Sequence, residues 1–392
     1  MKDLAKHAAL VGASLVVALL IAELALRVIG YREPILYQPD ARLGWIFRPG
    51  ADDWYTGEGR AFIQINSAGM HDREHALAKP EGVYRIVVLG DSYSEAKQVP
   101  IDSTYWSLLP GRLARCGFQA GKRIEVLNFS ISGYGTAQEL ILLRSLAGRY
   151  QPDLVLLQFT GSNDIRNNSR SLEPAKNRPF FVLDANGTLH LDDSFASRPG
   201  FRRVQSPFWR AYRRVAPYSR LVQFLRAAVH SRSSQRLERS FAVAEAGLDE
   251  AELKPPRTPQ WEDAWRVTET LIAEVDREAA RLGARTLVMT VPWPAQDLPD
   301  LKQREDFARR AGVPDLGYAD GRIEAFGKAH GIPVLVLAPG MGKVAETESK
   351  YLHGFGDNLG IGHWNTAGHS VAAGLIADAL CSDSLRAPTG PN

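Results

Sequence analysis

The stretch Arg85-Ile-Val-Val-Leu-Gly-Asp-Ser92 joins a short apolar run to a glycine, an acid and a serine. A run of this length suits a buried strand, and the polar residues after it indicate a turn into a helix. Similar runs recur at 124–128, 153–159, 285–291 and 333–337, with helical stretches between them. Strands that alternate with helices predict parallel pairing, with both faces of the sheet covered. We therefore expect an α/β fold, a three-layer α/β/α sandwich around a central, mostly parallel sheet.

Four polar or glycine-rich segments follow predicted strands or precede the last predicted helix. In a sheet of this kind, ligands bind beyond the carboxyl ends of the strands, so these segments are the candidates for a functional site. Taken singly, each has an ordinary structural explanation, such as a helix cap or a plain turn. Taken together they are far more specific. The segments are Gly90-Asp91-Ser92, Asn128 to Gly135, Gly161 to Asp164, and Gly362 to His369.

The order, spacing and placement of these segments resemble the SGNH/GDSL hydrolase family over roughly 84–380, apart from an insertion. The resemblance implies the flavodoxin-like fold of that family, with no cofactor and no metal. It implies that Ser92 is the nucleophile and that His363 is its general base. It also implies an oxyanion hole formed by the backbone N–H groups of Ser92 and Gly133 and by the side-chain amide of Asn163.

The chain departs from the family pattern at the third position of the triad. The family normally has an aspartate three residues before the histidine, where this chain has Gly360. Asp357 lies six residues before His363 and would complete a triad if the glycine-rich loop folds back. The alternative is a Ser-His dyad whose imidazole is oriented by a backbone carbonyl. We expect His369, on the last helix, to be structural.

The chemistry implied by the resemblance is acyl transfer through a serine. Related membrane-bound members O-acetylate or deacetylate exported polysaccharides. We therefore expect an esterase that hydrolyses an acyl ester, with acetyl on a carbohydrate as the favoured substrate, such as an acylated polysaccharide. One alternative is a polysaccharide O-acetyltransferase that uses the same residues. Another is a catalytically silent glycan-binding or export scaffold, which the missing aspartate favours and the intact serine, glycine, asparagine and histidine segments oppose.

The N-terminus carries an uncharged apolar run from Ala8 to Ala22, which Glu23 interrupts before Leu24 to Leu26 continue it. About 20 apolar residues span a bilayer core as a helix. We therefore expect an uncleaved, single-pass membrane anchor; a cleaved signal peptide and a buried soluble helix are the alternatives. The very short tail before the run favours a cytoplasmic N-terminus, which places the catalytic domain outside the cytoplasm, in the periplasm or outside the cell.

We divide the chain into an anchor at 1–30, a linking extension at 31–80 and a hydrolase domain at 81–392. A net charge of +3 does not point to nucleic acid as a partner. An insertion at about 165–258 interrupts the alternation of strands and helices, and its Asn186-Gly187 pair predicts a hairpin. The insertion is rich in arginine, which indicates contact with anionic headgroups or acidic glycans, or simply a solvated helical face. These arginines are Arg202, Arg203, Arg210, Arg213, Arg214, Arg220, Arg226, Arg232, Arg236 and Arg239.

Only two cysteines occur, Cys116 and Cys381, too few for a metal site and too far apart in sequence for a redox pair. They lie at the predicted ends of the first and last helices of the hydrolase domain. The topology of the resembled family makes these two helices neighbours, so we expect a disulfide, which an extracytoplasmic compartment would permit. Two separate thiols are the alternative.

Overall fold

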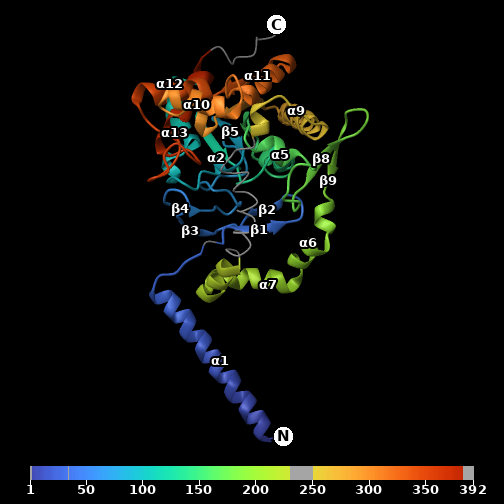
Figure 1. The fold of residues 1–392 in the computed structure, drawn as a ribbon, viewed down its shortest axis with the longest axis vertical. Helices are drawn as coiled ribbons and strands as arrows, with labels where there is room; N and C mark the ends of the chain where they lie inside the picture. Colours follow the sequence, from blue (N-terminus) through green and yellow to red (C-terminus); the bar gives the residue numbers. More distant parts are fainter. Residues whose placement is uncertain (1, 34, 230–249, 383–392) are drawn as a thin grey trace.

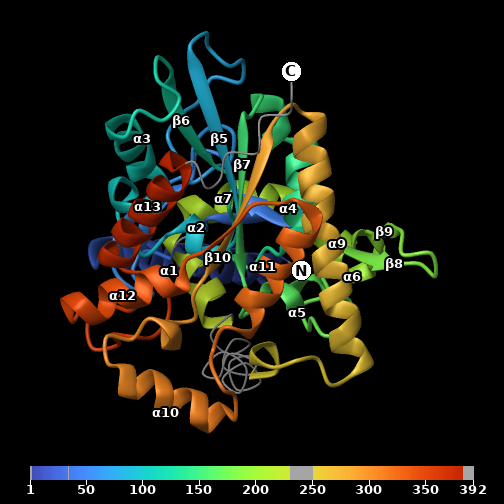
Figure 2. The same ribbon diagram turned by 90° about the horizontal axis from the view of Figure 1, so that it is seen from above.

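The computed structural model describes residues 2–33, 35–229 and 250–382. Its centre is a five-stranded sheet in the order β11-β10-β7-β5-β6, and each neighbouring pair is parallel. Helices lie on both sides of this sheet (Figure 2), which confirms the predicted three-layer α/β/α sandwich. The strands are β5 (Val83–Leu89), β6 (Arg123–Asn128), β7 (Leu154–Thr160), β10 (Arg285–Val291) and β11 (Val334–Val336).

Burial on both faces explains why the three central strands, β5, β7 and β10, are largely apolar runs. In β5, Ile86 and Val88 face one helical layer, whereas Val87 and Leu89 face the other. The first layer consists of α3 (Tyr105–Arg115), α12 (Ala338–Glu348) and α13 (Thr366–Cys381). The second consists of α4 (Thr136–Ser145), α9 (Pro259–Arg281) and α11 (Tyr318–His330). Because helices cover both faces of the sheet, a ligand-binding site can form at the carboxyl ends of the strands.

The predicted linking extension is packed into the same body. It forms two short antiparallel pairs, and its fully buried Phe47 and Ile63 join the core that α4 and α9 share with the sheet. The extension therefore contributes to the hydrophobic core as well as connecting the N-terminal helix to the sheet. The paired strands are β1 (Tyr37–Asp40) with β2 (Gly44–Phe47), and β3 (Asp52–Tyr55) with β4 (Ala61–Gln64).

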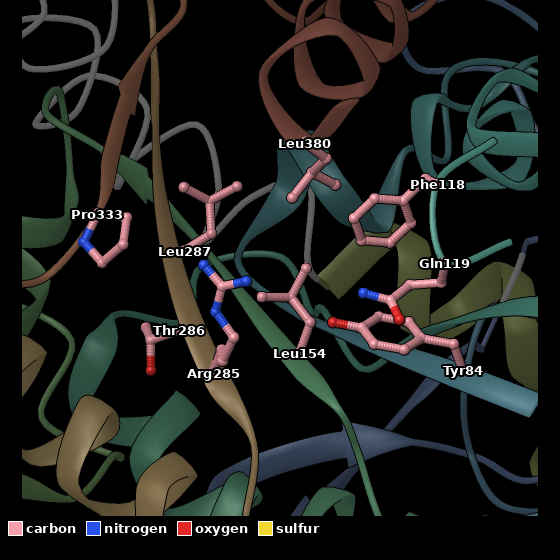
Figure 3. A pocket seen from close by; sticks show the side chains of 9 residues that line it. All are labelled: Tyr84, Phe118, Gln119, Leu154, Arg285, Thr286, Leu287, Pro333 and Leu380. Carbon is pink, nitrogen blue, oxygen red and sulfur yellow. The ribbon is translucent and has the colours of Figure 1, made fainter. Parts of the chain in front are cut away.

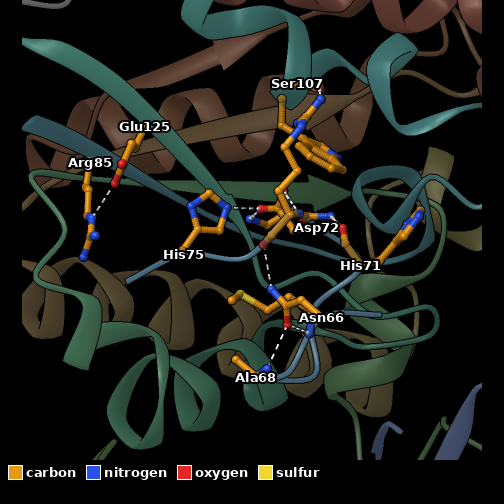
Figure 4. Close-up of polar contacts among 12 residues, drawn as sticks. Asn66, Ala68, His71, Asp72, His75, Arg85, Ser107 and Glu125 are labelled. Atoms are coloured by element: carbon orange, nitrogen blue, oxygen red, sulfur yellow. Dashed lines mark hydrogen bonds and ion pairs between the residues drawn. The ribbon is translucent and has the colours of Figure 1, made fainter. Parts of the chain in front are cut away.

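Polar contacts fix the end of the extension to the sheet (Figure 4). Asp72 Oδ2 accepts a hydrogen bond from the backbone N–H of Asn128 (2.9 Å), at the end of β6. His71 Nδ1 lies 2.6 Å from the backbone oxygen of Glu95. Both residues are buried, so these contacts satisfy backbone groups that would otherwise lack partners.

The described part of the insertion adds no strand to the central sheet. Strands β8 (Phe180–Leu183) and β9 (Leu189–Asp192) form the hairpin predicted from Asn186-Gly187. Helices α6 (Pro199–Val204), α7 (Pro207–Val215) and a helix over 220–229 follow. Arg232, Arg236 and Arg239 lie outside the described residues. The other helices are α2 (Ser92–Glu95), α5 (Asp164–Asn168) and α10 (Leu301–Ala311), and the 3₁₀ turns are Ile101–Ser103, Ala147–Tyr150, Ser194–Ser197, Ala216–Tyr218, Glu250–Leu253 and Pro294–Gln296.

Helix α1 (Lys2–Val28) projects away from the body (Figure 1). Its apolar side chains are exposed along its length, as Leu10, Val16 and Leu24 illustrate. Residues Asp3–Val28 are long and apolar enough to cross a membrane, a test that a signal sequence near the N-terminus also passes.

A disulfide joins Cys116, which caps α3, to Cys381, the last residue of α13. The two Cα atoms are 6.2 Å apart, and the bridge spans 265 positions in the sequence. The expected pairing is therefore present in the structure. Since α3 and α13 lie side by side in one helical layer, the bridge links the first and last helices that pack on the sheet.

We expect no free thiol in the denatured, unreduced protein and two after reduction. Closing a loop this long removes so much unfolded-chain entropy that the Cys381→Ser variant should lose up to about 4–5 kcal/mol of unfolding free energy. Thiol counting and urea unfolding with and without reductant provide the two readouts. Two free thiols in unreduced protein from its native compartment would contradict the bridge.

Candidate active site

Ser92 and His363 meet at the carboxyl edge of the sheet. Ser92 is the first residue of α2, directly after β5, and His363 lies just before α13. His363 Nε2 is 2.8 Å from Ser92 Oγ. Asp91 caps α2 by accepting the N–H of Tyr93 (3.0 Å), and Asn365 caps α13. These two helix caps fix the chain on either side of the serine–histidine contact.

Glu58 lies on the other side of the histidine ring. Its Oε2 is 2.8 Å from His363 Nδ1 and also accepts the backbone N–H of His363 (3.2 Å). Burial raises the pKa of Glu58, but the hydrogen bonds and charge of His363 outweigh this and lower it overall. An ionised Glu58 therefore holds the proton of His363 on Nδ1 and leaves Nε2 free to accept from Ser92.

The third triad position thus differs from the prediction. Asp357 was expected to fold back onto His363, but it lies on an exposed turn and Glu58 occupies the place beside Nδ1. The turn owes its path to glycines: Gly356 and Gly360 both have positive φ, of 57° and 80°. This backbone directs the loop outward.

Sequence reasoning missed Glu58 because it lies 305 positions from His363, in a segment with no recognised motif. A signal does exist in the glycines around it. A Cβ on Gly59 would stand 2.4 Å from the backbone oxygen of Gln98, and one on Gly362 would stand 2.8 Å from Glu58 Oε1. Gly59 therefore lets the loop between β3 and β4 approach the backbone at Gln98, and Gly362 leaves room for the Glu58 carboxylate beside His363.

Two further acids lie buried near the site. Burial, reinforced by neighbouring carboxylates, raises the pKa of Glu139 and that of Asp164 well above their ordinary values. Asp164 Oδ2 accepts the backbone N–H of Thr160 (2.7 Å) at the end of β7. Burial thus favours the protonated form of these two acids, whereas the contacts with His363 favour the ionised form of Glu58.

Gly133 and Asn163 lie on the turns after β6 and β7, the strands on either side of β5. Asn163 Nδ2 donates to Asp91 Oδ2 (3.1 Å), so this amide stands next to the residue that precedes Ser92. Gly133 has a φ of +76°, a left-handed conformation that favours glycine. The fold thus brings all three predicted oxyanion residues to one edge of the sheet.

Two residues outside the predicted site hold the turn at Gly133. Trp45, from the extension, donates its Nε1–H to the backbone oxygen of Ser132 (3.2 Å). Arg178, from the insertion, is buried, donates to the backbone oxygen of Gly133 and lies 5.0 Å over the Trp45 ring. The extension and the insertion therefore both position this turn, and sequence reasoning assigned neither residue.

We expect Asn163→Ala to lower kcat for ester hydrolysis by about 100-fold or more, with a smaller effect on KM, since an oxyanion donor acts mainly in the transition state. Steady-state kinetics on a short-chain aryl ester measure both constants. Asn167→Ala, on the same helical segment, serves as the control. An unchanged kcat in folded Asn163→Ala would remove this amide from the site.

His369 is a packing residue, as its position on α13 suggested. Its ring is buried, with the rings of Tyr105 and Trp364 at 6.1 and 5.6 Å. Nδ1 accepts the backbone N–H of Tyr105 (3.4 Å), which requires a neutral ring. Burial lowers the pKa of His369 to about 3.

This buried histidine makes stability depend on pH. The unfolded chain takes up the proton near pH 6.5, whereas the folded chain resists it down to about pH 3. The free energy of unfolding should therefore fall as pH drops through this window, by up to about 1.4 kcal/mol per pH unit. Urea unfolding at pH 7 and pH 5 measures the slope, and His369→Gln should reduce it. An equal slope in both proteins would contradict the assignment.

A hollow elsewhere on the body is lined by Tyr84, Leu154 and Arg285, among others (Figure 3). These residues stand at the amino ends of β5, β7 and β10. The hollow therefore lies at the end of the sheet opposite Ser92 and is separate from the candidate site.

Comparison with known proteins gives one sequence relative and several related folds. The chain is 41% identical to an arylesterase of Vibrio mimicus over 80 residues, which is 20% of this chain and 38% of that protein. The match thus spans well under half of the relative. No family model matches the chain.

Solved structures with a similar fold share little sequence with the chain. The structure of TesA is 16% identical, with a TM-score of 0.35, and the match covers 76% of this chain and 97% of that one. A GDSL-like lipase of Bacteroides thetaiotaomicron is 15% identical, with a TM-score of 0.32 and coverage of 76% and 87%. The acetyl xylan esterase AlAXEase is 12% identical, with a TM-score of 0.36 and coverage of 75% and 98%. The chain is therefore similar in sequence to an arylesterase over 80 residues, and similar in fold to a GDSL-like lipase and an acetyl xylan esterase.

Proposed function

We propose that this protein is a serine ester hydrolase of the SGNH/GDSL type. The observation that carries the proposal is the continuous chain of contacts from Ser92 Oγ through His363 to Glu58, with 2.8 Å at each step. A nucleophile, a base and an acid that orients the base are the parts that acyl transfer requires. This complete set opposes the interpretation as a catalytically silent scaffold, which rested on a missing acid.

In the proposed reaction, Ser92 Oγ attacks the ester carbonyl carbon while its proton passes to His363 Nε2. Glu58 stabilises the imidazolium that forms. The N–H groups of Ser92 and Gly133 and the amide of Asn163 hold the tetrahedral oxyanion. The C–O bond to the alcohol then breaks, and the alcohol leaves with the proton from His363. Water, activated by His363, attacks the acyl-serine, releases the acid and restores Ser92.

For the substrate we propose an acetyl ester of a carbohydrate, such as an acetylated polysaccharide. This follows the resemblance to family members that act on exported polysaccharides. A sugar hydroxyl in place of water would make the same acyl-serine an intermediate of O-acetyl transfer. Incubation with a labelled acetylated oligosaccharide and an unlabelled acceptor distinguishes the two outcomes. Hydrolysis predicts labelled acetate as the main product, and label in the acceptor exceeding acetate would overturn it in favour of the transferase.

We further propose that α1 anchors the protein in a membrane, with the catalytic body outside the cytoplasm. The support is the exposed, apolar length of α1 and a disulfide of the kind that oxidising compartments permit. Carbonate washing of membranes should leave the protein in the pellet at its full mass. A soluble product that starts downstream of Ala22 would instead support a cleaved signal.

A further inference from the structure

Glu23 ties α1 to the helix over 220–229 of the insertion. Glu23 Oε2 accepts hydrogen bonds from Ser219 Oγ (2.9 Å) and the N–H of Leu221 (2.8 Å). Glu23 Oε1 accepts from the N–H of Arg220 (3.0 Å) and from Arg27 Nε (2.8 Å). The Glu23 carboxylate thus caps the first turn of the helix over 220–229. At that end of a helix, the unpaired N–H groups and the helix dipole favour negative charge.

More contacts surround this joint. Arg27 Nη2 donates to the backbone oxygen of Tyr218 (2.6 Å), and the N–H of Glu33 donates to Gln223 Oε1 (3.2 Å). The rings of Tyr31 and Phe224 meet edge to face, 5.6 Å apart. Residues within the last turns of α1 and residues just after this helix therefore both contact the insertion. In Figure 1, α7 lies across the base of the body, at the end from which α1 projects.

The same segment of the insertion exposes large apolar side chains. Phe208 is 72% exposed, Val215 61%, Tyr218 75% and Val229 69%. Phe208 and Val215 are seven positions apart on α7, which puts them on one face of that helix. Exposing several large apolar side chains to water is unfavourable, so a segment that carries them and is joined to an apolar helix marks a surface for an apolar partner.

The segment is also strongly basic. Residues 199–229 contain no aspartate or glutamate, and their arginines are Arg202, Arg203, Arg210, Arg213, Arg214, Arg220 and Arg226. Helices that combine an apolar face with arginines lie in the interface of anionic bilayers, with the apolar face at the acyl boundary and the charges at the headgroups.

We propose that residues 199–229 form a membrane-surface platform that binds anionic phospholipid headgroups. Exposed apolar side chains such as Phe208 enter the acyl boundary, and the arginines contact lipid phosphates. Glu23 clamps the platform to α1 at the level where the helix leaves the apolar core. The catalytic body then stands on the bilayer in a fixed orientation. This inference rests on the proposal that α1 spans the membrane, and it favours a lipid over an acidic glycan because a soluble polyanion would not cover the apolar side chains.

The test uses the full chain in vesicles of phosphatidylcholine, with or without phosphatidylglycerol, that carry doxyl-labelled lipid. A fluorophore is attached to a single added cysteine, Phe208→Cys, because both native cysteines are bridged. Leu301→Cys on α10 is the matched control, since Leu301 is also exposed (47%) and α10 lies far from α1 in Figure 1. Lipid quenching at position 208 should exceed that at 301 by about threefold or more in anionic vesicles.

Charge and the clamp are tested in the same vesicles. Arg210→Glu with Arg214→Glu should cut quenching at 208 by about half or more, whereas Arg115→Glu with Arg257→Glu, exposed arginines outside the platform, should leave it unchanged. Glu23→Ala should lower quenching at 208 while the protein stays in the carbonate pellet.

Equal quenching at 208 and 301 in carbonate-resistant protein would overturn the platform. The platform would also be overturned if soluble polygalacturonate bound at position 208 and prevented quenching of the fluorophore there by lipid. That result would favour a glycan-binding surface. Release of the protein by carbonate would instead show that the anchor itself is wrong. None of these readouts depends on esterase activity, so they stand apart from the catalytic assignment.

Discussion

Ser92→Ala should lower ester hydrolysis by about 10⁴-fold or more, to near the background rate, while the protein stays folded. The structure gives the reason: Ser92 Oγ is the atom that contacts His363 Nε2, at the start of a helix and the edge of the sheet. Removing it leaves no oxygen to form the acyl-enzyme. The loss should appear in kcat, because the side chain contributes little to ground-state binding.

A matched control comes from the same edge of the sheet. Ser130 is buried after β6, and its Oγ has no hydrogen-bond partner among the described residues, so Ser130→Ala should keep most of the activity. Thermal unfolding of both variants checks that the fold is intact. Substantial activity in folded Ser92→Ala would exclude Ser92 as the nucleophile.

Glu58→Gln should lower kcat by about 10² to 10⁴-fold with little change in KM, as when a triad acid is replaced by its amide. The carboxylate oxygen that accepts from His363 Nδ1 also accepts the backbone N–H of His363. The amide introduced by Glu58→Gln lacks the negative charge that stabilises the imidazolium. Its NH₂ group can also donate to His363 Nδ1, which places the histidine proton on Nε2. In that tautomer Nε2 cannot accept the proton of Ser92.

Asp357→Asn is the matched control for this variant. It makes the same chemical change on the exposed loop that was first expected to supply the acid, and we expect activity close to that of the wild type. Glu58→Asp should recover part of what Glu58→Gln loses, because it keeps the charge. The reverse pattern, with Asp357→Asn inactive and Glu58→Gln active, would restore the original assignment.

The layers of the fold could be predicted because they depend on local patterns. Five apolar runs became the five strands, since strands covered on both faces need continuous apolar sequence. Ser92, Gly133, Asn163 and His363 could be located for a related reason: each lies at an end of a strand or helix that the same patterns define.

Glu58, Trp45 and Arg178 could not be predicted, because each acts through a contact between segments far apart in the chain. Trp45 and Arg178 meet over the turn at Gly133 from the extension and the insertion, neither of which has a regular repeat of strands and helices. The position of Asp357 near His363 in sequence was misleading, since a glycine-rich loop directs it outward. Proximity along a chain predicts contact poorly where positive-φ glycines turn the backbone.

We propose that the contacts between Ser92, His363 and Glu58 make Ser92 a reactive nucleophile. Mass-spectrometric mapping of the purified full-length protein, after reaction with a fluorophosphonate probe, tests it most directly. We expect one labelled peptide, modified at Ser92. Labelling should be absent in Ser92→Ala, slowed by about 100-fold or more in Glu58→Gln and unchanged in Asp357→Asn. Label on another residue, or an enzyme that hydrolyses esters without being labelled at Ser92, would contradict it.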